Sequence, residues 1–234
     1  MATEEMEARI ETLENQVKTL QKLLDIEEIK KLTRAYGYYI QRWMGNEIVD
    51  LFSDGPDVVL EFPSAEGTYL GKEGVKRYYL NRFKGGPEFM HQLMQLSPYI
   101  DVNPDGITAR GRWYGFGAIS VPRGGGVGQS YMNGTYENEY VKEGGKWKIK
   151  RLSYATNWHA RPGEKDGWVK PERIAAIDPD YKFTIPEPDL PPTGERPAAF
   201  PSGYIFPFHF KHPVTGEKTS EEQLNASLNV GKDK

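Results

Sequence analysis

The sequence of 234 residues contains no cysteine and only four histidines. Without cysteine the chain can form no disulfide, thiolate nucleophile or iron–sulfur cluster, and most structural zinc sites are excluded as well. Its formal net charge is −3, so no basic field attracts nucleic acid or an anionic membrane. No apolar run is long enough to span a bilayer, and the acidic N-terminal residues do not resemble a signal peptide, so we expect a cytoplasmic location.

Histidine is scarce, which makes the position of His91 informative. It opens an apolar, strand-like run over residues 89–96. An imidazole titrates near neutral pH, so His91 is either a hydrogen-bonded core residue or the acid/base group of a small-molecule site. The other histidines, His159, His209 and His212, could form a metal site only by tertiary convergence, and no nucleotide or flavin motif is present, so we expect neither metal nor cofactor.

Residues 1–24 form the first of three expected regions. Their apolar side chains recur alternately four and three residues apart, which predicts a helix with a heptad seam. The seam residues are Met6, Ile10, Leu13, Val17, Leu20 and Leu24. A helix of this kind either joins subunits into a homo-oligomer, a dimer or trimer, or lies on the domain that follows.

The second region, residues 25–160, combines helices with long strands. A helical pattern over 26–44 is predicted to stop at Gly45, and Asn46 is predicted to cap a short helix. The further expected elements are strands at 57–62 and 68–70, a helix at 72–83, and strands at 89–102, 107–121, 128–141 and 146–158. Turn residues at 103–106 and 143–145 predict two hairpins. This order indicates an α+β layer fold.

The third region, residues 161–234, is a proline-rich extension with few periodic elements. Its aromatic cluster at 204–210 is too apolar for a free linker. We therefore expect the extension to wrap along a surface or a neighbouring subunit.

Several features of the second region occur together: Tyr36 on the long helix, Glu61 in the first strand, His91 in the third, and the stretches 46–52, 136–140 and 147–149. Over residues 25–160 the sequence resembles the nuclear transport factor 2-like superfamily in its SnoaL-like branch. The resemblance implies a cone-shaped α+β barrel, in which a strongly bent, mostly antiparallel sheet wraps around a long helix. It also implies a small-molecule pocket at the open end of the cone.

The resemblance to scytalone dehydratase within this superfamily places His91 on that enzyme's acid/base histidine. It places Ile40 and Gln41 on a tyrosine–aspartate pair, Trp113 on a second histidine and Tyr136 on a pocket asparagine. Because Gln41 stands where the aspartate is expected, the dehydratase mechanism cannot be transferred intact.

Glu61 is the nearest replacement acid, because it interrupts the apolar alternation of the first strand. The alternative is a solvent-facing glutamate on an edge strand. Tyr36 and Tyr136 are predicted to point inward, either as catalytic phenols or as core residues. We therefore predict His91, Glu61, Tyr36 and Tyr136 as catalytic. The predicted substrate-binding residues are Tyr39, Gln41, Arg112, Trp113, Asn138, Arg151 and Asn157.

The leading hypothesis is a cofactor-independent lyase that acts by acid/base elimination on a small aromatic substrate. The resemblance to lignin-processing diarylpropane lyases suggests a lignin-derived diol, which loses formaldehyde and a hydroxyl to give a stilbene. One alternative is a dehydratase or isomerase of a polyketide, steroid or terpenoid. Others are a noncatalytic binding or assembly module and the small subunit of a ring-hydroxylating dioxygenase.

Overall fold

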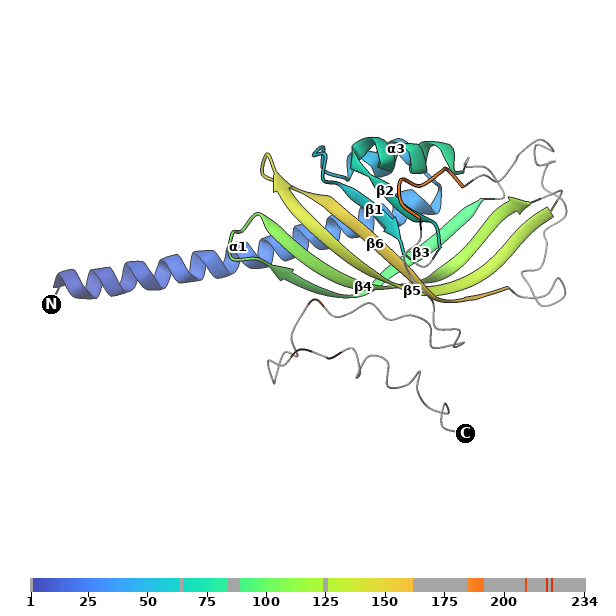
Figure 1. Cartoon of the computed structure of the whole chain (residues 1–234). Coiled ribbons are helices and arrows are strands. Elements are labelled where there is room, and N and C mark those ends of the chain that lie inside the picture. The colour runs from blue at the N-terminus through green and yellow to red at the C-terminus, as the bar shows by residue number, and fades with distance from the viewer. Residues whose placement is uncertain are drawn as a thin grey trace.

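The computed structural model describes residues 2–63, 65–83, 89–123, 126–161, 185–191, 209, 218 and 220. Its helices are α1 (Ala2–Gln41), α2 (Gly45–Asp50) and α3 (Gly71–Asn81). Its strands are β1 (Val59–Phe62), β2 (Gly67–Leu70), β3 (Met90–Val102), β4 (Thr108–Arg123), β5 (Gly126–Glu143) and β6 (Lys146–Ala160). Figure 1 shows a long helix lying against a strongly curved sheet. The expected order of helices and strands is thereby confirmed.

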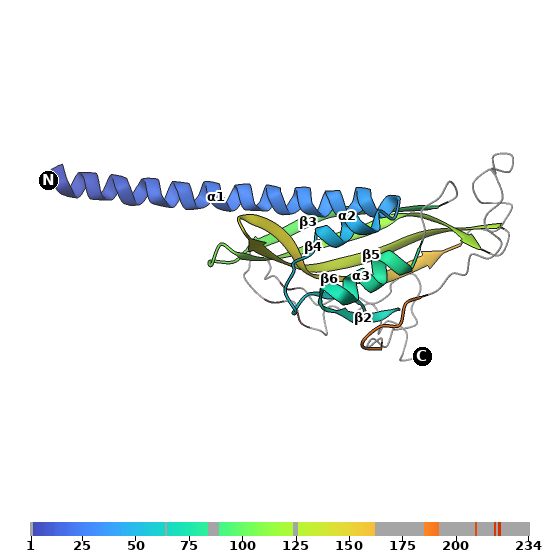
Figure 2. The same ribbon diagram turned by 90° about the horizontal axis from the view of Figure 1, so that it is seen from above.

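The strands form one six-stranded sheet in the order β2-β1-β6-β5-β4-β3. All neighbours are antiparallel except β1 and β6, which run parallel. The C-terminal part of α1 packs against β3 and β6, while α3 covers β1 and β2. The predicted α+β fold, with a mostly antiparallel sheet bent around a long helix, is confirmed (Figures 1 and 2).

Both predicted hairpins form. In the first, the amide of Gly106 donates to the carbonyl of Asn103 at 3.0 Å, and Gly106 has a φ of 67°. In the second, Gly144 and Gly145 have φ values of 56° and 77°. Glycine adopts these left-handed conformations without the steric cost that a side chain brings, so the turn residues set the register of β3 with β4 and of β5 with β6.

The two helical patterns at 4–24 and 26–44 form one continuous helix, α1. Described side chains up to Leu24 are exposed, whereas Asp25, Ile29 and Thr33 are buried. The N-terminal half of α1 therefore extends beyond the sheet and does not lie on the domain, as both views show (Figures 1 and 2).

The end of α1 differs from the prediction. Gly45 is the first residue of α2, and Met44 is its N-cap, so neither Gly45 nor Asn46 has the predicted capping role. The left-handed residue is Trp43, with a φ of 54°. Its indole N–H donates to the carbonyl of Tyr79 at 2.8 Å, and its ring packs on Phe83 and Phe89. These tertiary contacts hold a conformation that the local sequence does not favour.

Part of the C-terminal extension is placed. Residues 185–191 lie along the free edge of β2, where the amide of Thr68 donates to the carbonyl of Leu190 at 2.9 Å. Asp189 forms an ion pair with Arg77 of α3 at 2.7 Å. This segment follows the surface of its own domain, and the aromatic cluster at 204–210, His209 excepted, lies outside the described residues. In the part of the chain that is described, no helix is long and apolar enough to cross a bilayer.

Candidate functional site

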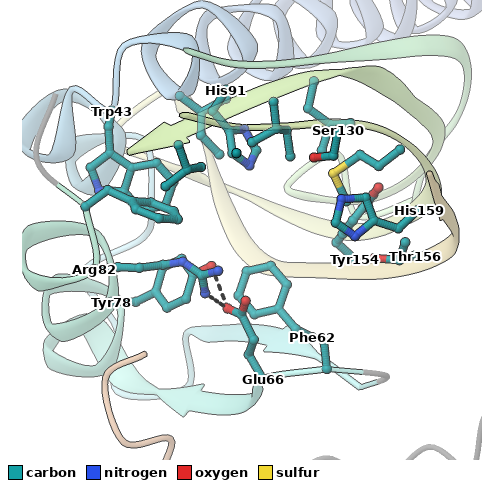
Figure 3. Close-up of a pocket in the computed structure, with 18 of the residues that line it drawn as sticks. Trp43, Phe62, Glu66, Tyr78, Arg82, His91, Ser130, Tyr154, Thr156 and His159 are labelled. Atoms are coloured by element: carbon teal, nitrogen blue, oxygen red, sulfur yellow. Dashed lines mark hydrogen bonds and ion pairs between the residues drawn. The ribbon is translucent and has the colours of Figure 1, made fainter. Parts of the chain in front are cut away.

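A cavity of about 410 Å³ opens between α1, α3 and the concave face of the sheet (Figure 3). Most of its wall is aromatic or aliphatic, and a few polar groups converge on it. The aromatic and aliphatic lining includes Tyr36, Ile40, Trp43, Phe62, Tyr78, Phe83, Leu93, Ile119, Val121, Met132, Tyr136 and Tyr154. The polar lining includes Glu66, Arg82, His91, Gln129, Ser130, Thr156 and His159. A volume of this size suits a small organic molecule.

His91 lies in this cavity near the start of β3. Its Nδ1 atom is buried and has no hydrogen-bond partner within the described part of the chain. Burial, together with the positive charge of Arg82, lowers the pKa of His91 from 6.5 to about 4. The imidazole is therefore neutral near pH 7, in the form that can accept a proton.

An ion pair between Glu66 and Arg82 forms the polar side of the cavity. The phenol of Tyr78 donates to the same Glu66 carboxylate at 2.8 Å. Arg82 also lies over the rings of Tyr78 and Phe83, at 5.1 and 4.7 Å from their centroids. Figure 3 shows this group on the opposite side of the cavity from His91. A ligand that spans the cavity would meet a neutral nitrogen at one side and a guanidinium at the other.

The phenols of the cavity floor stay protonated. The hydroxyls of Tyr36 and Tyr79 are 3.0 Å apart, and the amide of Gln95 lies 3.5 Å from the hydroxyl of Tyr136. Burial raises the pKa of Tyr36, Tyr79 and Tyr136 well above the usual value for a phenol. Of the three, Tyr36 and Tyr136 line the cavity, and their protonated hydroxyls can donate hydrogen bonds to a ligand at physiological pH.

His159 reaches the cavity because the pairing of β5 with β6 is irregular. Asn133 pairs with Trp158, and the next residue pairs with Thr156, so one residue of β6 is left over as a bulge. A bulge reverses the side on which later residues point. His159 therefore lines the cavity together with Thr156, while Trp158 contacts Phe116.

Over the described ranges, no group of three or more histidine, aspartate or glutamate side chains is close enough to hold a metal ion. The residues that line the cavity also offer no phosphate-binding loop at a helix start. The groups of the chain that line the cavity and can exchange protons or hold charge include an imidazole, a guanidinium, a carboxylate and several phenols.

The profile of the SnoaL-like domain matches residues 21–153, more than half of the chain. The chain belongs to the SnoaL-like family. The match begins within α1 and ends in β6, so the projecting start of the helix and the C-terminal extension lie outside it. No curated protein matches the sequence.

Solved structures of the same fold include hexachlorocyclohexane dehydrochlorinases. The LinA Type2 enzyme is 17% identical with a TM-score of 0.55, and the match covers 67% of this chain and 99% of that one. LinA-type3 from Novosphingobium barchaimii is 17% identical with a TM-score of 0.54, covering 65% and 99%. A protein assigned as a scytalone dehydratase from Novosphingobium aromaticivorans is 18% identical with a TM-score of 0.50, covering 73% and 97%. At these identities the similarity establishes the fold.

Within the SnoaL-like domain, three of the four predicted catalytic residues line one cavity: His91, Tyr36 and Tyr136. The fourth, Glu61, is not among the lining residues. Its carboxylate accepts hydrogen bonds from Arg151 at 3.1 and 2.5 Å and from the hydroxyl of Ser153 at 2.5 Å. The expected pairing of Glu61 with His91 is therefore not formed, because Arg151 and Ser153, across the β1–β6 pair, satisfy the carboxylate instead.

The predicted substrate-binding residues also lie outside the cavity lining, and their contacts explain why. Trp113 and Asn138 each donate to the hydroxyl of Tyr140 at 3.1 Å, in a buried network. Arg112 pairs with Glu137 on the neighbouring strand, and Asn157 donates to Asn133 at 2.9 Å. Arg151 holds Glu61, Tyr39 packs against the core, and Gln41 is half-buried at the end of α1.

The lining residues that were not predicted as site residues include Glu66, Tyr78, Arg82 and His159. Arg82 carried a signal, since it shares the periodic face of the third helix with apolar side chains, and a buried cation needs an anionic partner. Glu66 lies in a turn with no periodic pattern. His159 was hidden because the bulge changes the alternation of β6.

Proposed function

We propose that this protein is a cofactor-independent lyase that catalyses an elimination reaction of a small aromatic substrate by acid/base chemistry. The observation that carries the proposal is the His91 imidazole on the wall of an aromatic cavity of about 410 Å³, with an Nδ1 that no group of the described residues hydrogen-bonds. A neutral imidazole with a ring nitrogen that no other group hydrogen-bonds is suited to remove a proton from a substrate. Aromatic walls with a few polar groups suit an aryl compound that carries hydroxyl or methoxyl groups.

The roles of the other groups follow from their charge. Arg82 remains cationic and stabilises the negative charge that develops as a hydroxyl leaves. Glu66 holds the guanidinium in place through their ion pair, while its second partner, Tyr78, completes the cluster. Tyr136, whose pKa is raised by burial, stays protonated and donates to the leaving oxygen.

The finer proposal is a diarylpropane diol of the kind derived from lignin. His91 takes the proton of the terminal hydroxyl, the carbon–carbon bond to that carbon breaks, and formaldehyde leaves. The released electron pair forms the carbon–carbon double bond of a stilbene as the benzylic hydroxyl departs with a proton from Tyr136. Formaldehyde, water and stilbene together account for all atoms of the diol. Return of the proton from His91 to Tyr136 resets the site.

The test is incubation of the full chain with a 1,2-diarylpropane-1,3-diol. We expect stilbene absorbance and formaldehyde to appear in equal amounts, and His91→Ala to lower kcat/KM by about 10² to 10⁴. Gln92→Ala is the matched control, because Gln92 is the exposed neighbour of His91 on β3. Water loss without formaldehyde would favour a dehydratase. Binding without turnover, or copurification with an iron-containing larger subunit, would overturn the lyase assignment.

A further inference from the structure

The projecting half of α1 exposes an apolar seam that nothing in the described chain covers. The seam residues Met6, Ile10, Leu13, Val17, Leu20 and Leu24 are between 51% and 64% exposed. The segment of the helix that carries them is about 28 Å long. Figures 1 and 2 show this half of the helix clear of the sheet from both directions. An apolar stripe of this length is typical of a surface that binds another helix.

We propose that this seam pairs with the seam of a second copy of the chain to form a parallel, two-stranded coiled coil. In heptad notation the a positions are Ile10, Val17 and Leu24, and the d positions are Met6, Leu13 and Leu20. β-Branched residues at a with leucine at d favour two parallel strands over three or four. Two of the three a positions are β-branched and two of the three d positions are leucine.

Charge selects the parallel direction. In a parallel pair, Arg9 at a g position faces Glu14 at the following e position of the other helix, an attractive contact made twice by symmetry. In an antiparallel pair with the same seam buried, Glu14 would face its own copy and Arg9 would face Leu23. The antiparallel arrangement therefore replaces two attractive contacts with a repulsive one.

The position of the domain on α1 leaves room for this partner. Thr33 faces the domain interior, where its hydroxyl lies 2.8 Å from that of Tyr140. Leu24 and Thr33 are nine residues apart, and at about 100° per residue they lie on opposite sides of the helix. The seam thus points away from the sheet, so two domains would diverge on opposite sides of a shared helix pair. Beyond Leu24 the next seam positions are Glu27, Lys31 and Arg34, which end the apolar stripe.

The absence of cysteine makes the direction of pairing directly measurable. A single Met6→Cys substitution in the full chain places one thiol at a d position. In the parallel pair the two Cys side chains are adjacent, and mild oxidation gives a disulfide-linked dimer. In the antiparallel pair residue 6 faces residue 24 of the other chain. Thr12→Cys, on the outer side of the helix, is the matched control, and we expect it to give no more than background cross-linking.

The mass in solution tests the seam itself. We expect the full chain to sediment at twice the mass of one 26.6 kDa chain. Leu13→Glu with Leu20→Glu should give single chains, whereas Thr12→Glu with Thr19→Glu, which adds equal charge on the outer side, should leave the dimer intact. A trimer mass, a seam variant that keeps its mass, or equal cross-linking of Met6→Cys and Thr12→Cys would each overturn the proposal.

Discussion

The imidazole of His91 meets the indole of Trp43 edge to face, with ring centroids 5.8 Å apart. Trp43 takes this place because it adopts a left-handed backbone conformation and donates its indole N–H to Tyr79. Among the described residues, the His91 imidazole is therefore held by packing against Trp43, and no group hydrogen-bonds its Nδ1.

Such an imidazole should make the fold sensitive to acid. The pKa of His91 falls from 6.5 to about 4 on folding, so the unfolded chain binds a proton that the folded chain does not between these values. As far as His91 is concerned, the free energy of unfolding is therefore highest above pH 6.5. It decreases by about 3 kcal/mol in total as the pH falls towards 4.

His91→Phe, which keeps a ring in the same aromatic environment, should remove this pH-dependent part of the free energy of unfolding. Urea unfolding of both proteins at pH 7, 5.5 and 4.5 measures it as the difference between their free energies of unfolding. A constant difference across this range would show that His91 is protonated equally in both states.

Arg82 should control the proton affinity of His91. The guanidinium contributes to the lowered pKa of His91, after desolvation. Arg82→Gln is therefore expected to raise that pKa, and the acidic limb of the kcat/KM profile should move to higher pH. The resonances of the His91 ring, followed by NMR titration, report the pKa directly. Glu66→Gln is the companion variant, because it perturbs the same ion pair and leaves the positive charge in place.

Substitution of Glu61 should lower the stability of the protein, whereas substitution of His91 should lower its activity. Because Glu61 binds Arg151 and Ser153 away from the cavity lining, Glu61→Gln should lower the free energy of unfolding by about 1 to 2 kcal/mol. Its kcat/KM should stay within about twofold of the parent, whereas His91→Ala loses orders of magnitude. Urea unfolding and steady-state kinetics on the same preparations check both values. A large loss of kcat/KM in Glu61→Gln would restore this residue as a catalytic acid.

Most of the sheet could be predicted from the sequence, because the signals that define its hairpins are local. Turn residues at 103–106 and the two glycines at 144 and 145 fix hairpin register within a few residues, and the alternation of the long strands follows from that register. His91 was predicted as a site residue in the same way, because it is a titratable group near the start of a mainly apolar strand.

The rest of the site depends on contacts between distant segments. Glu66 becomes a site residue only because α3 brings Arg82 beside it, and His159 only because one bulge reverses β6. Glu61 was misplaced because strand alternation gives the face of a residue but not its partner, and the parallel β1–β6 pairing supplies Arg151. The left-handed Trp43 is likewise a product of tertiary packing.

Gly67 should control whether the segment 185–191 stays on the edge of β2. Gly67 has a φ of 85°, and a Cβ atom there would lie 2.2 Å from the carbonyl oxygen of Leu190. Gly67→Ala therefore adds a backbone strain of about 1 kcal/mol and a clash that only displacement of the segment can relieve. The Thr68 amide, which donates to that oxygen at 2.9 Å, would lose its partner.

The matched control is Gly106→Ala. Gly106 has a similar φ of 67°, but a Cβ atom there meets nothing within 4 Å, so it adds the strain without the clash. Hydrogen exchange of the Thr68 amide should therefore accelerate at least tenfold in Gly67→Ala and stay at the parent rate in Gly106→Ala. Because Glu66 precedes Gly67 directly, release of this edge should also loosen the Glu66–Arg82 pair and weaken ligand binding in the cavity. Unchanged exchange at Thr68 in Gly67→Ala would mean that the segment is not anchored there in solution.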